Sequence, residues 1–198
     1  MPPLAGASVL VGVTGGIAAY KSAALVSQLA QAGAQVTVIM TDAAVRFVTP
    51  LTFEALSARP VITGRWEEGP GSDPQHIALA AAADVAVVAP CTMDCLARLA
   101  VGLAGDAVTL VLSAVDRART PVILAPAMNA VMWGQPATQR NVRLLREDGY
   151  VFVGPGAGWQ ACRTIGPGRM AEPEEILREM SRALAAREGR PERGEDQG

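Results

Sequence analysis

Five short runs of hydrophobic residues divide the chain, and each is bounded by glycine, proline, aspartate or threonine. The runs are SVLVGVT (8–14), AQVTVIMT (34–41), DVAVVAP (84–90), PVILAP (121–126) and YVFVGP (150–155). Their apolar residues follow one another instead of alternating with polar ones, as is typical of strands that are buried on both faces. We therefore expect five strands of a parallel sheet.

Three segments have the periodicity of helices, namely residues 18–33, 136–149 and 172–188. The apolar positions of the first form one stripe of Ala19, Ala23, Val26 and Ala30. Gly33 is placed to end that helix. Because strands alternate with helices, the expected fold class is α/β, with a single-domain, doubly wound parallel sheet of the Rossmann or flavodoxin-like kind.

The rest of the chain predicts how this domain is bounded. We expect one domain over residues 1–185 and a charged, disordered tail over residues 186–198. Residues 58–75 are rich in loop-forming residues and are expected to be mobile. The segment LARLAVGLAGDAVTLVLSA (96–114) predicts a helix whose smooth apolar face a monomer should not expose.

Composition excludes several classes of function. Of 198 residues, 50% are hydrophobic and 18% are charged, and the net charge of −2 comes without a basic block, so we expect no nucleic-acid partner. The longest apolar run, residues 77–91, contains Asp84 and is too short to span a membrane. One histidine and three cysteines cannot build a zinc site, so we expect no metal. The N-terminal segment lacks the features of a signal peptide, and a cytoplasmic location is expected.

Candidate chemistry falls where strands end, which is where open parallel sheets bind ligands. Thr14, Gly15 and Gly16 join the first strand to a helix, so their backbone could cradle a phosphate. The spacing is neither that of a dinucleotide fingerprint nor that of a P-loop, and a tight turn without a ligand explains the pattern equally well. Asp42 ends the second strand, where an acid could bind ribose.

The strand that ends at Pro90 is followed by a second set of polar groups. Thr92 and Asp94 could offer donors to a ligand or could simply cap the next helix. Cys91 and Cys95 are interpreted as small buried hydrophobic residues and not as ligands.

Three further residues are candidates for catalysis. His76 is the one imidazole of the chain and follows its most irregular segment, although a structural or exposed role fits it as well. Cys162 lies in GPGAGWQACRTIGPGRM (154–170), a glycine-rich segment that predicts a mobile lid, and is either a catalytic or a free surface thiol. Asn129 follows a strand and is crowded by Met128, Met132 and Trp133, so its amide is expected to need hydrogen-bond partners.

These segments together resemble the homo-oligomeric flavin-containing cysteine decarboxylases over about residues 8–180. PAMNAVMW (126–133) matches the motif P-A-M-N-x-x-M-W of that family at every fixed position. GGIAAYK (15–21), APCTMDC (89–95), HI (76–77) and ACRTIGPGRM (161–170) are similar to its flavin-phosphate turn, flavin segment, histidine segment and substrate clamp. Within the family, the chain most resembles the phosphopantothenoylcysteine decarboxylases of coenzyme A synthesis.

The resemblance implies an FMN cofactor and a phosphopantothenoylcysteine substrate. The residues that it assigns to the cofactor are Thr14, Gly15, Gly16, Ile17, Thr41, Thr92, Met93, Asp94, Cys95 and Ala125. Those that it assigns to the substrate are Asn129, Met132, Ala161 and Arg169. Hydride transfer from the carbon that bears sulfur to the flavin would give a thioaldehyde β to the carboxylate, and carbon dioxide could then leave to give an enethiolate. By the same analogy Asn129 donates to the carboxylate, His76 is the base, and Cys162 supplies the proton of the final reduction.

The resemblance also implies a homo-oligomer, a trimer or a dodecamer, whose active sites close between subunits. Three positions depart from the family pattern: Met93 and Arg163 replace a small residue and a glycine, and basic residues are absent shortly after His76. Two other functions remain open, decarboxylation of a peptide's C-terminal cysteine and a non-catalytic, flavin-binding regulatory role. The synthetase domain of many bacterial members has no room after residue 185, so we expect it to be separate or removed.

Overall fold

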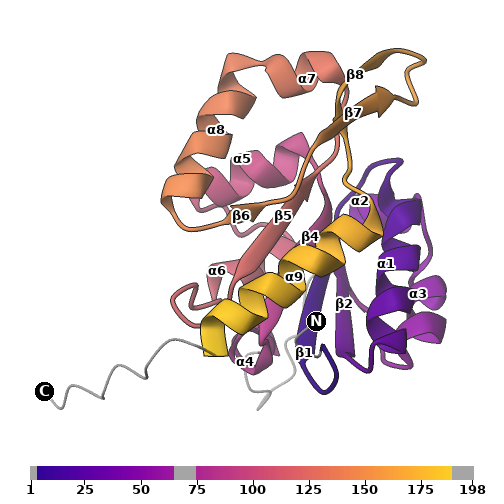
Figure 1. The fold of residues 1–198 in the computed structure, drawn as a ribbon, viewed down its shortest axis with the longest axis vertical. Helices are drawn as coiled ribbons and strands as arrows, with labels where there is room; N and C mark the ends of the chain where they lie inside the picture. Colours follow the sequence, from indigo (N-terminus) through magenta and orange to yellow (C-terminus); the bar gives the residue numbers. More distant parts are fainter. Residues whose placement is uncertain (1–3, 65–74, 189–198) are drawn as a thin grey trace, which may run out of the picture.

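The fold is built on a six-stranded parallel sheet. The computed structural model describes residues 4–64 and 75–188, and Figure 1 shows the sheet at the centre of the molecule. In the order β3-β2-β1-β4-β5-β6 the strands are Ile62–Thr63, Gln35–Met40, Ser8–Val13, Val85–Cys91, Val122–Pro126 and Val151–Phe152. All five predicted strands and the α/β fold class are confirmed. The two-residue β3 was not predicted, because it lies within residues 58–75, which the sequence assigned to a loop.

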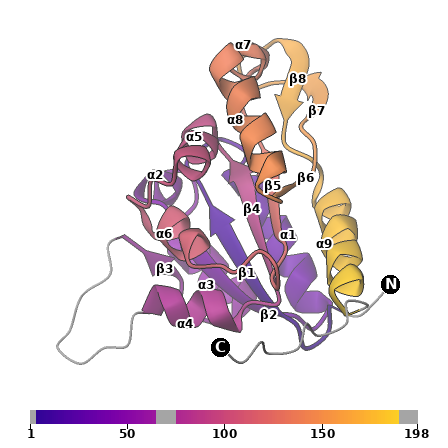
Figure 2. The same ribbon diagram turned by 90° about the vertical axis from the view of Figure 1, so that its left-hand side faces the viewer.

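Nine helices and a hairpin complete the described part of the chain. The helices are α1 (Ala19–Gln31), α2 (Asp42–Val45), α3 (Pro50–Ser57), α4 (Gln75–Ala82), α5 (Met93–Val101), α6 (Ala107–Ser113), α7 (Ala130–Gly134), α8 (Pro136–Glu147) and α9 (Pro173–Glu188). The hairpin pairs β7 (Gly156–Trp159) with β8 (Ile165–Arg169) in antiparallel fashion, and Figure 2 shows it beside α7, at the opposite end of the molecule from α4. The predicted lid is therefore a paired β-ribbon.

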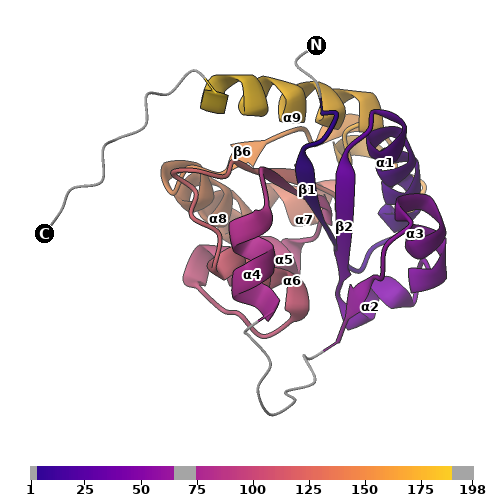
Figure 3. The same ribbon diagram turned by 90° about the horizontal axis from the view of Figure 1, so that it is seen from below.

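The helices form a layer on each face of the sheet, as Figure 3 shows. Successive residues of a buried strand point to opposite faces, so Val9 and Val11 pack toward α1 and α9 while Leu10 packs toward α5 and α6. On the α6 side, a Cβ at Gly12 would lie 2.9 Å from a methyl group of Val108. This glycine therefore lets α6 approach the backbone of β1.

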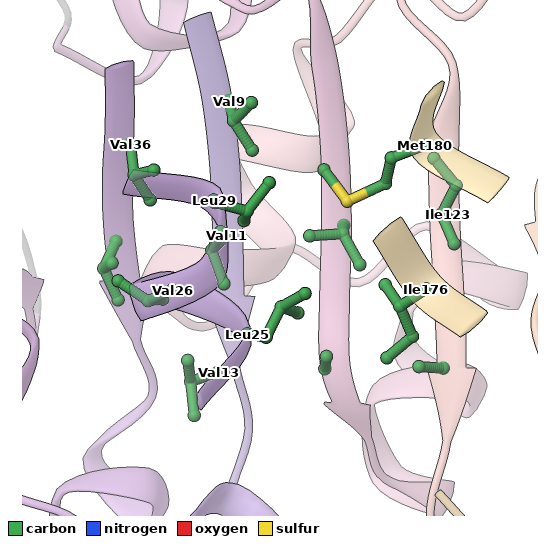
Figure 4. Close-up of a cluster of buried hydrophobic side chains, with 14 of the residues drawn as sticks. Val9, Val11, Val13, Leu25, Val26, Leu29, Val36, Ile123, Ile176 and Met180 are labelled. Carbon is green, nitrogen blue, oxygen red and sulfur yellow. The ribbon is translucent and has the colours of Figure 1, made fainter. Parts of the chain in front are cut away.

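Leucines of α1 fill the core between this helix and the sheet, as Figure 4 shows. The helix buries Ala19, Ser22, Leu25, Val26 and Leu29. The predicted stripe was thus half right, because Ala23 and Ala30 are only half-buried and the larger leucines take the positions against the strands. Gly33 ends the helix at φ +81°, as predicted.

Residues 96–114 do not form the single helix that their composition predicted. Gly102 ends α5 in a left-handed conformation, and Asp106 begins α6 with a capping box. Leu96, Val108 and Val111 of this segment are buried inside the chain. These side chains cover the sheet, whereas Val101 and Leu103 of the same segment keep 64% and 57% of their surface exposed.

Two predicted mobile segments extend beyond the described residues. Of the loop 58–75, residues 65–74 lie outside them, as do residues 189–198 of the predicted tail. Residues 186–188 were also assigned to the tail but belong to the last turn of α9. Within the described ranges, no helix is long and apolar enough to cross a membrane, and no group of three His, Cys, Asp or Glu side chains could hold a metal ion.

Candidate active site

A cavity of about 1020 Å³ opens at the carboxyl ends of the central strands. The turns after β1, β2, β4 and β5 and the β7–β8 hairpin supply most of its wall, and residues of α1, α5, α7 and the α5–α6 connection complete it. Small-molecule sites in proteins occupy roughly 300–1,000 Å³. The cavity is therefore large enough for a cofactor together with a substrate.

The side chain of Thr14 ties two strand ends together beneath the cavity. Its hydroxyl donates to the carbonyl of Pro90 (2.7 Å) and accepts from the backbone N–H of Thr92 (3.1 Å). The neighbouring carbonyl of Ala89 accepts from the buried Ser22 hydroxyl at 2.5 Å. Because its hydroxyl is engaged in this way, Thr14 holds the floor of the site in shape.

Gly15 and Gly16 have different physical reasons to be glycines. A Cβ at Gly15 would lie 2.4 Å from the Cβ of Ala43, so this position is fixed by close packing of the β1–α1 turn against α2. At Gly16 the nearest atom would be a methyl group of Thr92 at 3.6 Å, which is an ordinary contact. Gly15 thus serves the fold, and the backbone at Gly16 is the part that a ligand can approach.

Threonines cap two helices whose N-termini border the cavity. The hydroxyl of Thr41 accepts from the N–H of Ala44 (3.2 Å), and that of Thr92 accepts from the N–H of Cys95 (3.3 Å). The sequence offered both Thr92 and Asp94 as the N-cap of this helix, and the structure shows that Thr92 is the cap. Asp94 instead forms an exposed ion pair with Arg98 on the next turn.

Asn129 begins helix α7 and is exposed at the rim of the cavity, not buried among methionines as we had expected. Its Oδ1 accepts from the backbone N–H of Met132 at 2.8 Å. Within the described residues, no group accepts a hydrogen bond from its Nδ2. The two N–H groups of the amide can therefore serve a ligand.

Cys162 lies at the turn of the hairpin, on the same cavity as Asn129. Its thiol is exposed and lies 3.1 Å from the hydroxyl of Thr164. Cys91 and Cys95 are buried, as predicted, and burial raises the pKa of the Cys91 thiol well above its usual value. Of the three cysteines only Cys162 is exposed, although the buried Cys95 also lines the cavity.

An ion-pair network joins the hairpin to α1 at another side of the cavity. Lys21 donates to both carboxylate oxygens of Glu172 (2.9 and 3.0 Å), and Arg169 also hydrogen-bonds to Glu172. The hydrogen bond from Lys21, aided by that from Arg169, lowers the pKa of the Glu172 carboxyl below its usual value. Arg169 therefore reaches the cavity with its position fixed by a carboxylate.

Two predicted site residues do not line the cavity. Ala125 is completely buried in β5, and Ala127 and Met128 take its place in the wall. His76 lies in the first turn of α4, at the other end of the molecule from the hairpin (Figure 2). The other predicted residues all line it: Thr14, Gly15, Gly16, Ile17, Thr41, Thr92, Met93, Asp94, Cys95, Asn129, Met132, Ala161, Cys162 and Arg169.

Several other wall residues were not singled out from the sequence, among them Lys21, Trp159 and Gln160. Lys21 closes the segment GGIAAYK, and Trp159 and Gln160 come directly before Ala161 and Cys162. Their nearness to recognisable motifs was the only signal in the sequence that could have found them.

A family model described as Flavoprotein matches residues 3–185. The chain belongs to the Flavoprotein family. The predicted resemblance to flavin-containing proteins is therefore confirmed. The donor set also fits a flavin, because backbone N–H groups at the Gly16 turn suit a phosphate and the apolar Met93, Met128 and Trp159 suit a planar ring system.

A curated relative of this Flavoprotein member is the coenzyme A biosynthesis bifunctional protein CoaBC of Bacillus subtilis. The two are 46% identical over 187 residues, which is 94% of this chain and 45% of the relative. A relative of the same name from Escherichia coli strain K12 is 43% identical over 174 residues, 88% of this chain and 42% of that protein. The chain thus spans less than half the length of these relatives.

Solved structures of Flavoprotein-like folds agree with the architecture. The FMN-dependent cysteine decarboxylase SpaF is 34% identical, with a TM-score of 0.78 over 92% of this chain and 99% of that one. A PPC decarboxylase mutant complexed with pantothenoylaminoethenethiol is 30% identical, with a TM-score of 0.79 over 88% of this chain and 96% of that one.

Proposed function

We propose that this chain catalyses the FMN-dependent decarboxylation of 4′-phosphopantothenoylcysteine to 4′-phosphopantetheine in coenzyme A biosynthesis. The observation that carries the proposal is that Asn129 and Cys162 line the same cavity as the Gly16 turn. The CoaBC relatives and the PPC decarboxylase complex support the choice of substrate. An aminoethenethiol is what remains when an N-acylated cysteine has lost carbon dioxide and two hydrogens, that is, two electrons and two protons.

FMN is favoured over FAD because one phosphate cradle is present at the strand ends. The Gly16 turn and the N-terminus of α5 would hold its phosphate, and the methionines of the wall would contact its rings. When bound, FMN would accept a hydride from the carbon that bears sulfur and return it after carbon dioxide has left.

Asn129 and Cys162 would act in turn at the same carbon of the substrate, first on its carboxylate and then on the carbon itself. The Nδ2 group of Asn129 would donate to the carboxylate and hold it for release as carbon dioxide. The thiol of Cys162 would give its proton to the carbon from which carbon dioxide has left. The hydroxyl of Thr164, 3.1 Å from the sulfur, can then stabilise the thiolate that remains.

The base in this scheme must come from a second copy of the chain. His76 is outside the cavity of its own chain, so it can act only if another subunit brings it to Asn129 and Cys162. Ile17 and Tyr20 line the cavity and keep 60% and 62% of their surface exposed, which is the kind of apolar surface that a partner covers. The family resemblance implies that this oligomer is a homotrimer or a homododecamer.

A second candidate function is decarboxylation of a peptide's C-terminal cysteine. SpaF, an FMN-dependent cysteine decarboxylase that is 34% identical to this chain, is compatible with either candidate. The two functions separate at the final step, because only the coenzyme A reaction reduces the enethiol. The exposed Cys162 beside Thr164 supports the reaction that needs this last proton. A non-catalytic flavin-binding role would consume neither substrate.

The test combines cofactor and product analysis. Mass spectrometry of the cofactor released from purified protein should find FMN, whereas FAD, NAD or no cofactor would exclude the mechanism. Incubation with phosphopantothenoylcysteine and, separately, with a peptide that ends in cysteine should release carbon dioxide from the former. Release from the peptide alone would establish the second candidate, and release from neither would leave the regulatory role.

A further inference from the structure

The carboxamide of Gln160 joins the Asn129 segment to the turn that carries Cys162. The side chain is buried, with 7% of its surface exposed. Its Oε1 accepts from the backbone N–H of Ala130 (3.1 Å), the hydroxyl of Thr164 (3.4 Å) and the thiol of Cys162 (3.6 Å). One oxygen atom therefore contacts the residue next to Asn129 and, at the same time, both functional side chains of the turn.

The other half of the same amide fixes Gln160 to strand β8. Its Nε2 donates to the carbonyl of Pro167 at 2.8 Å and lies 3.4 Å from that of Gly166. The backbone of Gln160 also closes the turn, because its N–H donates to Thr164 and its carbonyl accepts from Arg163. A residue with both a donor and an acceptor is required here, and an apolar side chain of similar size would lose every one of the side-chain contacts.

We propose that Gln160 is a positioning residue that sets the place of the Cys162 thiol relative to Asn129. The inference rests on the proposed function, in which the carboxylate and the proton donor must be held at fixed places on one substrate. Gln160 itself need not touch the reacting atoms. Its effect is exerted through Ala130 on one side and through Cys162 and Thr164 on the other.

The packing around Gln160 supports a rigid link and not a loose contact. A Cβ at Gly166 would lie 2.8 Å from the Cβ of Ala130, and one at Gly168 would lie 2.2 Å from the carbonyl of Met128. The backbone N–H of Met128 also donates to Gly168 at 2.9 Å. The hairpin and the Asn129 segment are thus in backbone contact. The side chain of Gln160 connects this contact to the thiol of Cys162 through hydrogen bonds.

The first test replaces Gln160 by methionine, which keeps the length of the side chain and removes its polar atoms. We expect flavin content to stay within about twofold, because Gln160 makes no hydrogen bond to the Gly16 turn that would hold the phosphate, and the product is analysed per carbon dioxide released. The fraction of product that remains at the enethiol stage should rise about fivefold, the factor for one lost hydrogen bond. Alkylation of Cys162 by iodoacetamide should also quicken about fivefold, and the burial of Cys91 and Cys95 makes this readout specific.

A matched control is the same substitution at Gln139. The Nε2 group of Gln139 donates to the carbonyl of Trp133 at 2.6 Å, at the end of α7 away from the hairpin. Gln139→Met removes a comparable hydrogen bond without touching the Cys162 turn. It should leave both the enethiol fraction and the alkylation rate at the wild-type values.

A second variant removes the hydrogen bond between Ala130 and Gln160 by changing Ala130, in case Gln160→Met fails to fold. Ala130→Pro removes the N–H that donates to Gln160, and proline is well tolerated as the first residue of a helix. Asn129 has φ −74° and ψ 164°, which is the conformation favoured before proline. The variant should give the same rise in enethiol, and the double variant should be no worse than either single one.

The outcomes separate this inference from the proposed function. Unchanged enethiol fraction and alkylation rate in both variants would show that Gln160 only fills space, and the inference would be overturned. If wild-type protein turns over no cysteine substrate, the proposed function fails, while the alkylation rates still decide whether Gln160 positions the thiol. A fivefold change in alkylation, absent from Gln139→Met, supports the inference in either case.

Discussion

The side-chain oxygen of Asn129 accepts a 2.8 Å hydrogen bond from the backbone N–H of Met132 and so caps helix α7. The residue proposed to hold the substrate carboxylate thus also has a task in the fold. The two tasks use different atoms, Oδ1 for the cap and Nδ2 for the ligand. A substitution that changes only the nitrogen can therefore test one task without the other.

Asn129→Asp is that substitution. Aspartate caps a helix as well as asparagine does, so oligomer size and flavin content should stay normal. The new carboxylate would repel that of the substrate by ~4 kcal/mol, for unit charges ~4 Å apart at an effective dielectric of ~20. Carbon dioxide release should fall about a thousandfold. Wild-type turnover by this variant would mean that the carboxamide is only a cap.

Gly168→Ala should displace the hairpin from the Asn129 segment and so lower the rate of decarboxylation. Gly168 has φ +123°, and a Cβ there would lie 2.2 Å from the carbonyl of Met128, so the hairpin must shift. A displacement of ~1 Å at a catalytic group can cost about 100-fold in rate. Gly149→Ala is the control, because Gly149 has φ +90° but no atom within 4 Å of a Cβ. If both variants lose activity equally, backbone strain and not the seating of the hairpin is responsible.

Arg163 occupies a left-handed conformation, at φ +65°, in the turn beside Cys162. The family glycine at this position would adopt it without strain, so Arg163→Gly should stabilise the protein by about 0.5–1 kcal/mol. At fixed protein concentration the melting temperature should rise by about 1–3 °C. Ala58→Gly, at φ 55° on the remote α3, should give a similar rise. A fall for Arg163→Gly alone would show that the arginine side chain stabilises the turn.

Strands β1, β2, β4 and β5 could be predicted because strands that are largely buried on both faces are mostly apolar along their length, and β6 because its two residues lie in the apolar run 150–155. The hairpin could not, since its glycines look like flexibility and instead allow close approach, as at Gly166 against Ala130. The same limit applies to Asn129. Its neighbours in the chain are apolar, but Asn129 and Met132 are both exposed and line the cavity, and a one-dimensional pattern does not show that.

The site residues divide along similar physical lines. Those in the turns after strands, such as Thr41 and Thr92, could be located because parallel strands bring their carboxyl ends to one edge. Ala125 was misplaced because β5 continues through Pro126 and keeps that alanine in the core. His76 could be placed near the start of a helix. The sequence of one chain does not show whether His76 contacts the cavity of its own chain or that of another copy.

The proposed sharing of a site between copies predicts complementation. Homomers of His76→Asn and of Asn129→Asp should each be inactive. Co-expressed with different affinity tags and purified as mixed oligomers, they should regain part of the wild-type activity, because some cavities would combine an intact histidine with an intact asparagine. The single-tag oligomers are the control. Mixed oligomers as inactive as the parents would place both residues in the site of one chain.

The most direct test of the proposed reaction is the mass of the product that purified protein forms from 4′-phosphopantothenoylcysteine. Wild-type protein should form 4′-phosphopantetheine with one carbon dioxide per substrate. Cys162→Ser should release carbon dioxide but leave the product two hydrogens lighter, as the enethiol, because the last proton is missing. An enethiol from both proteins, or 4′-phosphopantetheine from both, would contradict the role given to Cys162, and unreacted substrate with the wild-type protein would contradict the proposed function itself.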